Sequence, residues 1–405
     1  MRVLLLNYEY PPCGSGAGLA TEALAEGLAT RGMTVDVVAG GEHASTDPRL
    51  IWDGESGTEG RLTVHRVPSR RLGTHEAGIR GAFGYLAAAL PVVRGLLARE
   101  RYDVVHFVFS LPTAAMLPLL DLRGTPVIVS LRGSDVPGYD VRRPGVQRAH
   151  SLLHPLTRWI WSRADRVVVP SESLGQLARR TAPRLRYAVL PGGVDLSRFR
   201  PRVALRRVPD GVTRCLAVGR LVERNGFDDL LDAMALLDRH RFQLEIVGTG
   251  PHEAALHQRV RRLGLGDRVR FAGWLDQAQL ARRYRQADLF TLAPWVESFG
   301  GAFLEALASG LPIVGSTVGG VPELVAHSRN GLLVTPRHPQ ELARAIAELA
   351  ADPRHCAELG RRNRSEAVEK YSWHRMTARF LALYHGAARQ VPSRRPLPEL
   401  SSSGW

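Results

Sequence analysis

The chain has 405 residues, 44% hydrophobic and 23% charged, which is typical of a folded globular protein with two domains of about 200 residues each. Cys13, Cys215 and Cys356 form no CxxC pair, which argues against a disulfide framework or a thiolate metal site and favours a reducing compartment, the cytoplasm. The net charge of +15 rests on arginine, because Lys370 is the only lysine, but no basic stripe interleaved with aromatic residues predicts a nucleic-acid partner.

The first half of the chain alternates between predicted strands and helices. The whole chain contains no run of 18 apolar residues that would predict a transmembrane helix, and the apolar start at residues 2–8 is too short for a signal peptide. Continuous apolar, β-branched runs indicate strands that are buried on both faces of a parallel sheet. These predicted strands are residues 2–8, 34–40, 62–67, 103–109, 126–131, 166–171 and 187–191. Helical stretches such as residues 19–32, which end in Gly32, separate them.

A Gly- and Pro-rich stretch, "PGGVDLSRFRP" at 191–201, predicts a linker, after which the pattern restarts. The second set of predicted strands covers residues 214–221, 242–248, 268–275, 287–294, 312–317 and 331–334, with a helix expected over 227–240. Two doubly wound α/β domains follow from this alternation. We expect a first domain at 1–192, a second at 193–371, a helix at 372–388 and a disordered tail at 389–405.

Ligands of doubly wound domains bind at the carboxyl ends of the strands, so the glycine-rich loops there are candidate sites. The first such loop, "PPCGSGAG" at 11–18, brings Gly14, Ser15 and Gly16 to the start of a helix, whose free N–H groups favour anions. A dinucleotide GxGxxG motif fails in detail, because Leu19 or Thr21 takes the place of the last glycine.

The stretch "ESFGGAFLE" at 297–305 contains more groups that could bind a ligand than the first loop does. Gly300 and Gly301 follow a predicted strand and open a predicted helix, so the first-turn N–H groups are exposed to a diphosphate. Glu297 and Glu305 lie on either side, and carboxylates accept hydrogen bonds from vicinal hydroxyls. A sugar at one end and a ribose at the other, joined by a diphosphate, would satisfy this pattern. The alternative is that both are surface glutamates without a ligand.

Further motifs lie at other strand ends of the second domain. "VGRLVERNGFDDLL" at 218–231 places Arg220 at a strand end before a Gly-opened helix, and "IVGTGP" at 246–251 and "FAGW" at 271–274 add glycines at two more. Together with E-x7-E, with "NYEYPP" and its following glycines (7–18) and with the "PGGVD" linker, they resemble the retaining GT-B glycosyltransferases of family 4. The resemblance covers residues 1 to about 388.

The resemblance implies a GT-B fold of two Rossmann-like domains facing across a cleft, with a C-terminal helix crossing back to the first. It implies a nucleotide-diphosphate sugar donor, an acceptor of unknown identity, retention of anomeric configuration and no metal or other cofactor. Glu297 would contact the transferred sugar, Glu305 the ribose, and Arg220 with the amides of Gly300 and Gly301 the diphosphate. The donor side would also include Phe299, Gly248, Gly250 and Trp274, and from the first domain Gly14, Ser15 and Gly16.

Three positions depart from the family pattern. The usual lysine of "GRL…KG" is Asn225, and we expect Arg224 beside it to supply the second cation, although the two cations differ in reach. The usual "HGxD" loop reads "RGSD" at 132–135, with Arg132 in the place of the histidine as a sugar-side candidate. Alternatively, Arg132 only pairs with Asp135 or Glu9. The usual double glycine of the first loop is interrupted by Ser15.

Proteins of the same fold also have other functions. A phosphorylase-like enzyme of the same fold needs a lysine for pyridoxal phosphate, and Lys370 lies away from the predicted strand ends. A nucleotide-sugar 2-epimerase and a non-catalytic nucleotide-sugar-binding subunit stay open as alternatives.

The sequence predicts less about the acceptor and the membrane. Acceptor recognition is expected in the first domain, at 41–63 and 136–160, without a readable motif. Residues 142–164 mix arginine with Trp159 and Trp161, as interfacial helices do. The alternatives are peripheral contact with the inner face of the membrane and a helix that packs both tryptophans onto the sheet, which is the interpretation we favour.

Overall fold

The computed structural model describes residues 1–389 except 15, 54–57, 70–77, 143 and 203–210. Ser15, and the expected tail beyond Arg389, therefore lie outside the described residues. Contacts between residues divide the chain into two compact units, one of residues 1–130, 159–167 and 378–405 and the other of residues 131–158 and 168–377.

The first sheet has eight strands in the order β3-β4-β2-β1-β5-β6-β7-β8. They are β1 (Arg2–Asn7), β2 (Thr34–Gly41), β3 (Ser45–Asp53), β4 (Thr58–Pro68), β5 (Val104–Val108), β6 (Val127–Ser130), β7 (Arg166–Val169) and β8 (Tyr187–Val189). All seven predicted strands are confirmed. The eighth, β3, was missed because "STDPRLIWD" has no apolar run; it pairs antiparallel to β4 at the edge of the sheet.

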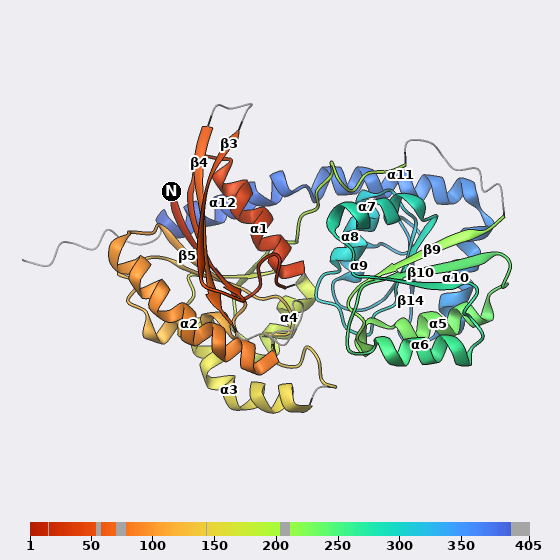
Figure 1. Cartoon of the computed structure of the whole chain (residues 1–405), viewed down its shortest axis with the longest axis horizontal. Coiled ribbons are helices and arrows are strands. Elements are labelled where there is room, and N and C mark those ends of the chain that lie inside the picture. Colours follow the sequence, from red (N-terminus) through yellow and green to blue (C-terminus); the bar gives the residue numbers. More distant parts are fainter. Residues whose placement is uncertain (15, 54–57, 70–77, 143, 203–210, 390–405) are drawn as a thin grey trace, which may run out of the picture. The chain divides into compact units, whose positions relative to one another are not determined.

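Helices α1 (Gly16–Ala29) and α2 (Gly78–Arg99) cover opposite faces of this sheet (Figure 1). Right-handed crossovers require this, because α1 leads from β1 outward to β2 and α2 leads from β4 back to β5. Within the described residues, one stretch, Arg80–Arg99 of α2, is long and apolar enough to cross a membrane. Tyr85, Ala89 and Val93 of this stretch are buried and the Tyr85 hydroxyl donates to the Val38 carbonyl, so α2 also serves as a core helix. The remaining helices before the second sheet are η1 (Thr113–Leu119), α3 (Pro144–Arg163) and α4 (Glu172–Thr181).

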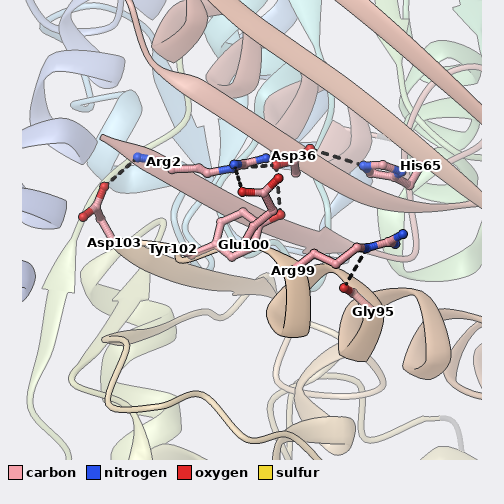
Figure 2. Close-up of polar contacts among 8 residues, drawn as sticks. All are labelled: Arg2, Asp36, His65, Gly95, Arg99, Glu100, Tyr102 and Asp103. Carbon is pink, nitrogen blue, oxygen red and sulfur yellow. Dashed lines mark hydrogen bonds and ion pairs between the residues drawn. The ribbon is translucent and has the colours of Figure 1, made fainter.

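A polar network joins the amino-terminal ends of β1, β2 and β5 around the buried carboxylate of Asp36 (Figure 2). Asp36 accepts hydrogen bonds from Tyr102 (2.9 Å) and Arg2 (3.3 Å) and lies 3.2 Å from His65 Nε2, while Arg2 also pairs with Glu100. Burial raises the pKa of Asp36, but the hydrogen bonds from His65 and Tyr102 and the charge of Arg2 outweigh it, and the pKa is lowered. The network therefore fixes the strand starts, at the edge of the sheet opposite to the carboxyl ends.

The second sheet has six strands in the order β11-β10-β9-β12-β13-β14. They are β9 (Thr213–Val218), β10 (Phe242–Val247), β11 (Val269–Gly273), β12 (Leu289–Thr291), β13 (Ile313–Ser316) and β14 (Leu332–Val334), and they confirm all six predicted strands. Among them lie η2 (Glu223–Asn225), α5 (Phe227–Leu236), α6 (Glu253–Arg262), α7 (Gln277–Gln286), α8 (Gly301–Ala308), α9 (Val321–Leu324), α10 (Pro339–Ala351) and α11 (Pro353–Lys370).

Two helix boundaries differ from the sequence prediction. The helix expected over 227–240 ends at Leu236, because Leu237 is extended and the Asp238 side chain accepts the His240 N–H in a local turn. The helix expected over 19–32 begins three residues earlier, at Gly16, and ends at Ala29.

The last helix, α12 (Trp373–Arg389), confirms the expected crossing element. Its first residues group with the second unit, and its residues from 378 onward group with the first. There Phe380 and Tyr384 are buried, and the Tyr384 hydroxyl lies 2.7 Å from Nδ1 of the buried His106 on β5.

Candidate active site

The second sheet has a topological switch point between β9 and β12. From β9 the chain proceeds outward through β10 to β11, and it returns to β12 before proceeding the other way. The loops that leave the carboxyl ends of β9 and β12 therefore diverge, and such a crevice is where open α/β sheets bind ligands. Arg220 and Arg224 lie on the first of these loops and Glu297 to Gly301 on the second.

Close backbone contacts join these two loops. The Trp295 N–H donates to the Arg224 carbonyl at 2.7 Å. Gly226 has a φ of 74°, and a Cβ at this position would lie 2.1 Å from the Ala293 carbonyl oxygen. Only glycine permits this approach, so the Gly that opens α5 also sets the distance between the loops.

Gly300 and Gly301 open α8 as the sequence predicted. Gly300 is the N-cap with a φ of 100°, and the first helical bond runs from Leu304 N–H to the Gly300 carbonyl at 3.1 Å. The N–H groups of residues 301–303 therefore have no hydrogen-bond acceptor within α8. Gly301 is exposed, and no atom lies within 4 Å of where its Cβ would be. The helix thus presents bare N–H groups and the positive end of its dipole to a ligand.

The backbone holds Glu297 in place before this helix. Its Oε1 accepts the N–H groups of Ser298 (2.8 Å) and Phe299 (3.1 Å). Behind it, a Cβ on Gly319 would lie 1.7 Å from the Glu297 carbonyl oxygen, and Gly320 N–H donates to that oxygen at 3.2 Å. The glycine pair after β13 therefore supports the Glu297 loop. Sequence reasoning missed this pair, although a Gly-Gly between a strand and a helix was the available signal.

Glu305 lies in the second turn of α8 and is half-buried. Its Oε2 is 2.9 Å from the hydroxyl of the buried Tyr284, which also lies 3.0 Å from the Ala302 carbonyl oxygen. Burial raises the pKa of Glu305 to about 7, although the hydrogen bond from Tyr284 acts to lower it. The Glu305 carboxyl is therefore held by a protein neighbour, Tyr284, which the sequence did not indicate.

Arg220 lies two residues beyond β9, and its backbone is fixed by neighbouring loops. The Asn225 side-chain amide donates to the Arg220 carbonyl at 2.8 Å, so the residue in the place of the family's lysine has a local structural role. Gly248 and Gly250 follow β10, and Cβ atoms there would lie 2.0 Å from the Gly219 carbonyl oxygen and 2.3 Å from that of Leu221. These two glycines are thus required for packing against the Arg220 loop.

The loop after β6 belongs to the same unit as Glu297 and contacts its loop. Asp135 Oδ1 accepts the N–H groups of Arg132 (2.8 Å) and Gly133 (3.0 Å), and a Cβ on Gly133 would lie 2.9 Å from the Tyr139 ring and 3.0 Å from Ser298 Cβ. Burial, followed by the charge of Glu297, raises the pKa of Tyr139. Arg132 is therefore held by its backbone at the edge of the Glu297 loop.

Arg224 forms an ion pair across these loops. Its Nη1 lies 3.0 Å from Oδ2 of the nearly buried Asp140, and its guanidinium lies 5.9 Å from the centre of the Tyr139 ring. Arg224 is therefore not a solvated surface residue. The sequence analysis placed Tyr139 and Asp140 only within the expected acceptor region at 136–160, because neither stands in a recognisable motif.

The remaining predicted donor-side residues are Phe299, Trp274, Gly14 and Gly16. The Phe299 ring packs toward the linker, 3.0 Å from where a Gly192 Cβ would be, and Trp274 follows β11 with 59% of its surface exposed. In the first unit, Gly14 has a φ of 108° against Glu9, and Gly16 begins α1. Among the described residues, no three His, Cys, Asp or Glu side chains form a group that could hold a metal ion.

Comparison with known proteins agrees with this arrangement. The family model "Glycosyl transferases group 1" matches residues 206–366, and the model "Glycosyl transferase 4-like domain" matches residues 15–193. A sucrose-phosphate synthase from Thermosynechococcus elongatus has a similar structure, with a TM-score of 0.82 and 25% identity over 95% of this chain and 98% of that one.

Two sequence relatives extend the comparison. An uncharacterized glycosyltransferase from Methanocaldococcus jannaschii is 26% identical over 95% of this chain and 98% of its own length. The GDP-mannose-dependent alpha-(1-6)-phosphatidylinositol monomannoside mannosyltransferase of Mycobacterium tuberculosis is 30% identical over 73% of this chain and 78% of its own length. Two parallel-sheet domains, the E-x7-E helix at the switch point and these matches place the chain in the GT-B glycosyltransferases of family 4.

Proposed function

We propose that this chain transfers a glycosyl group from a nucleoside-diphosphate sugar to an acceptor nucleophile, with retention of anomeric configuration and without a divalent metal. The observation that carries the proposal is the open N-terminus of α8 at the switch point, with Glu297 before it and Glu305 in its second turn. The bare N–H groups suit the diphosphate, and the two carboxylates suit hydroxyls on either side of it.

The chemistry follows from where charge develops. When the bond between the anomeric carbon and the leaving oxygen breaks, negative charge builds on the diphosphate, and Arg220 and the α8 N–H groups stabilise it. Glu297 orients the sugar as its ring gains positive charge. In a front-face route the acceptor oxygen forms the new bond on the same face, and its proton passes to the departing phosphate oxygen. No residue of this chain is then needed as a general base.

The proposal leaves the nucleobase and the sugar open. The Mycobacterium tuberculosis relative is named for its dependence on GDP-mannose. GDP-sugars therefore belong in any screen of this chain, together with UDP-, ADP- and dTDP-sugars. The thiols of Cys13, Cys215 and Cys356 are free, which supports a reducing, cytoplasmic location.

A thermal-shift panel of these nucleotide sugars tests the proposal. A ligand that binds only the folded state raises the unfolding temperature in proportion to RT ln(1 + [L]/Kd), so the true donor should give the largest shift. The purified enzyme should then release nucleoside diphosphate from that donor at the same rate in EDTA as in Mg²⁺. Loss of turnover in EDTA that Mg²⁺ restores would overturn metal independence. Conversion of the donor to an isomeric nucleotide sugar without acceptor would indicate an epimerase, and binding without any turnover a non-catalytic subunit.

A further inference from the structure

Helix α3 presents an apolar and basic stripe to solvent. Arg148, Leu152, Trp159 and Arg163 are all exposed, and Leu152 and Trp159 expose 82% and 40% of their surface. Their spacings of four, seven and four residues place the four side chains within about 60° around the helix axis. The helix therefore has one continuous outward face on which two large apolar side chains lie between arginines.

The opposite face of α3 anchors the helix to the protein. His150, Thr157, Ile160 and Trp161 are buried, and Trp161 Nε1 donates to Ser110 Oγ at 2.8 Å. The sequence analysis favoured packing of both tryptophans onto the sheet, and this is correct for Trp161 but wrong for Trp159. Packing thus accounts for one tryptophan and leaves the other available to an external partner.

The charge on this helix is of one sign. The 20 residues of α3 include no Asp or Glu. Arg148, Arg158 and Arg163 are exposed, and none of them forms an ion pair with a carboxylate in the described part of the chain. By contrast, Arg224 and Arg259 are paired with carboxylates. The positive charge of α3 is therefore left for a negatively charged surface.

We propose that α3 is a docking helix for anionic membrane surfaces, with Leu152 and Trp159 inserted at the headgroup level and Arg148 and Arg163 contacting lipid phosphates. Helices that lie in a bilayer interface combine an uncompensated basic face with Trp and Leu side chains in this way. Arginine keeps its charged end in the headgroup region while its stem lies along the apolar layer.

Co-sedimentation of the full chain with vesicles tests this assignment. Wild-type protein should bind vesicles of phosphatidylcholine mixed with phosphatidylglycerol, should bind pure phosphatidylcholine much more weakly, and should be released by salt because the charges are screened. An Arg148→Gln/Arg163→Gln variant should bind the anionic vesicles roughly thirtyfold more weakly, since each arginine near such a surface contributes about a fivefold factor. Arg261→Gln/Arg262→Gln is the matched control, because these two exposed arginines lie on α6 and their loss changes the net charge equally.

A second readout tests insertion of the apolar residues. Brominated lipids should quench less of the tryptophan fluorescence in Trp159→Phe than in wild type, and Leu152→Ser should weaken binding while Leu236→Ser on α5 should not. Melting curves verify that each variant is folded. Equal losses for the α3 and α6 arginine pairs would show that overall charge, not α3, attracts the vesicles. That result, or unchanged binding of the α3 variants, would overturn the proposal.

Discussion

Glu297 and Glu305 belong to one motif but lie in different environments. Glu297 Oε1 accepts hydrogen bonds from two backbone N–H groups, which fix the position of its carboxylate, whereas Glu305 is half-buried against Tyr284 with its pKa raised to about 7. The two carboxylates are therefore suited to different tasks. A carboxylate that is fixed in position suits contact with the reacting sugar. A carboxyl that is half protonated near neutral pH suits contact with a hydroxyl group whose binding shifts it between the protonated and ionised forms.

Glu305 should make nucleotide binding depend on pH. Ribose hydroxyls donate to the carboxylate, so they bind the ionised form and lower its pKa below the value of about 7 in the free protein. Affinity should therefore be greatest above pH 7 and should weaken as the pH falls below 7, by up to about tenfold per pH unit until the pKa of the complex is reached. Calorimetric titration of the nucleoside diphosphate across this range measures the slope. Glu305→Gln corrects for the titration of the phosphates, and an identical slope in that variant would contradict the prediction.

Glu297→Gln should affect turnover more than binding. The amide oxygen can still accept the two backbone N–H groups, so the loop is preserved, but the negative charge beside the sugar is lost. We expect kcat to fall by about 10²–10³, as for other groups that act on the developing charge, while the Kd of the nucleoside diphosphate changes little. If Glu297→Gln instead lost nucleotide binding and Glu305→Ala kept it, the two roles would be exchanged.

Arg224 forms an ion pair with Asp140 in the free protein, and we propose that it binds a phosphate of the donor. Losing a charge-assisted bond to a desolvated phosphate should lower kcat/KM of Arg224→Ala about ten- to a hundredfold, and Asn225→Lys should restore part of it. The loss should persist in an Asp140→Asn background, because the phosphate contact does not require Asp140. If Arg224→Ala had no effect in that background, Arg224 would serve only the loop that Asp140 belongs to.

At the scale of elements, the sequence predicted what local pattern determines. Thirteen of the fourteen strands among the described residues were predicted, mostly from runs of apolar residues, because strands of a buried parallel sheet have apolar side chains on both faces. The edge strand β3 lacks this pattern, since its partner β4, and not its own burial, makes it a strand. The end of α5 depends on a side-chain turn at Asp238, which helix periodicity does not report.

The candidate site was predictable where the residues of a single motif form it, and less so where other loops support it. Gly300 and Gly301 could be placed because a strand precedes them and a helix follows. Gly319 and Tyr284 could not be assigned a role, because each acts through a residue distant in sequence, Glu297 or Glu305. A single sequence shows which residue is present but not which loops meet.

At the scale of the whole molecule, the chain has two units with separate cores, and α12 has residues in both. The first-unit part contributes Phe380 and Tyr384 to the surroundings of His106, while the proposed nucleotide site lies in the second unit. A protein of this kind is not expected to unfold in a single two-state step. Each unit should instead respond to its own perturbation.

Phe380→Ala separates the two responses. Removing this buried ring should destabilise the first unit by about 3–5 kcal/mol, because the cavity is only partly filled by relaxation. A nucleoside diphosphate should raise the unfolding temperature of the second unit only. Calorimetry should therefore show one transition lowered by Phe380→Ala and another raised by the nucleotide, whereas His385→Ala, an exposed position on the same helix, should change neither. A single transition that moves with both perturbations would mean that the units unfold together, and α12 would then couple them strongly enough to make the chain one cooperative body.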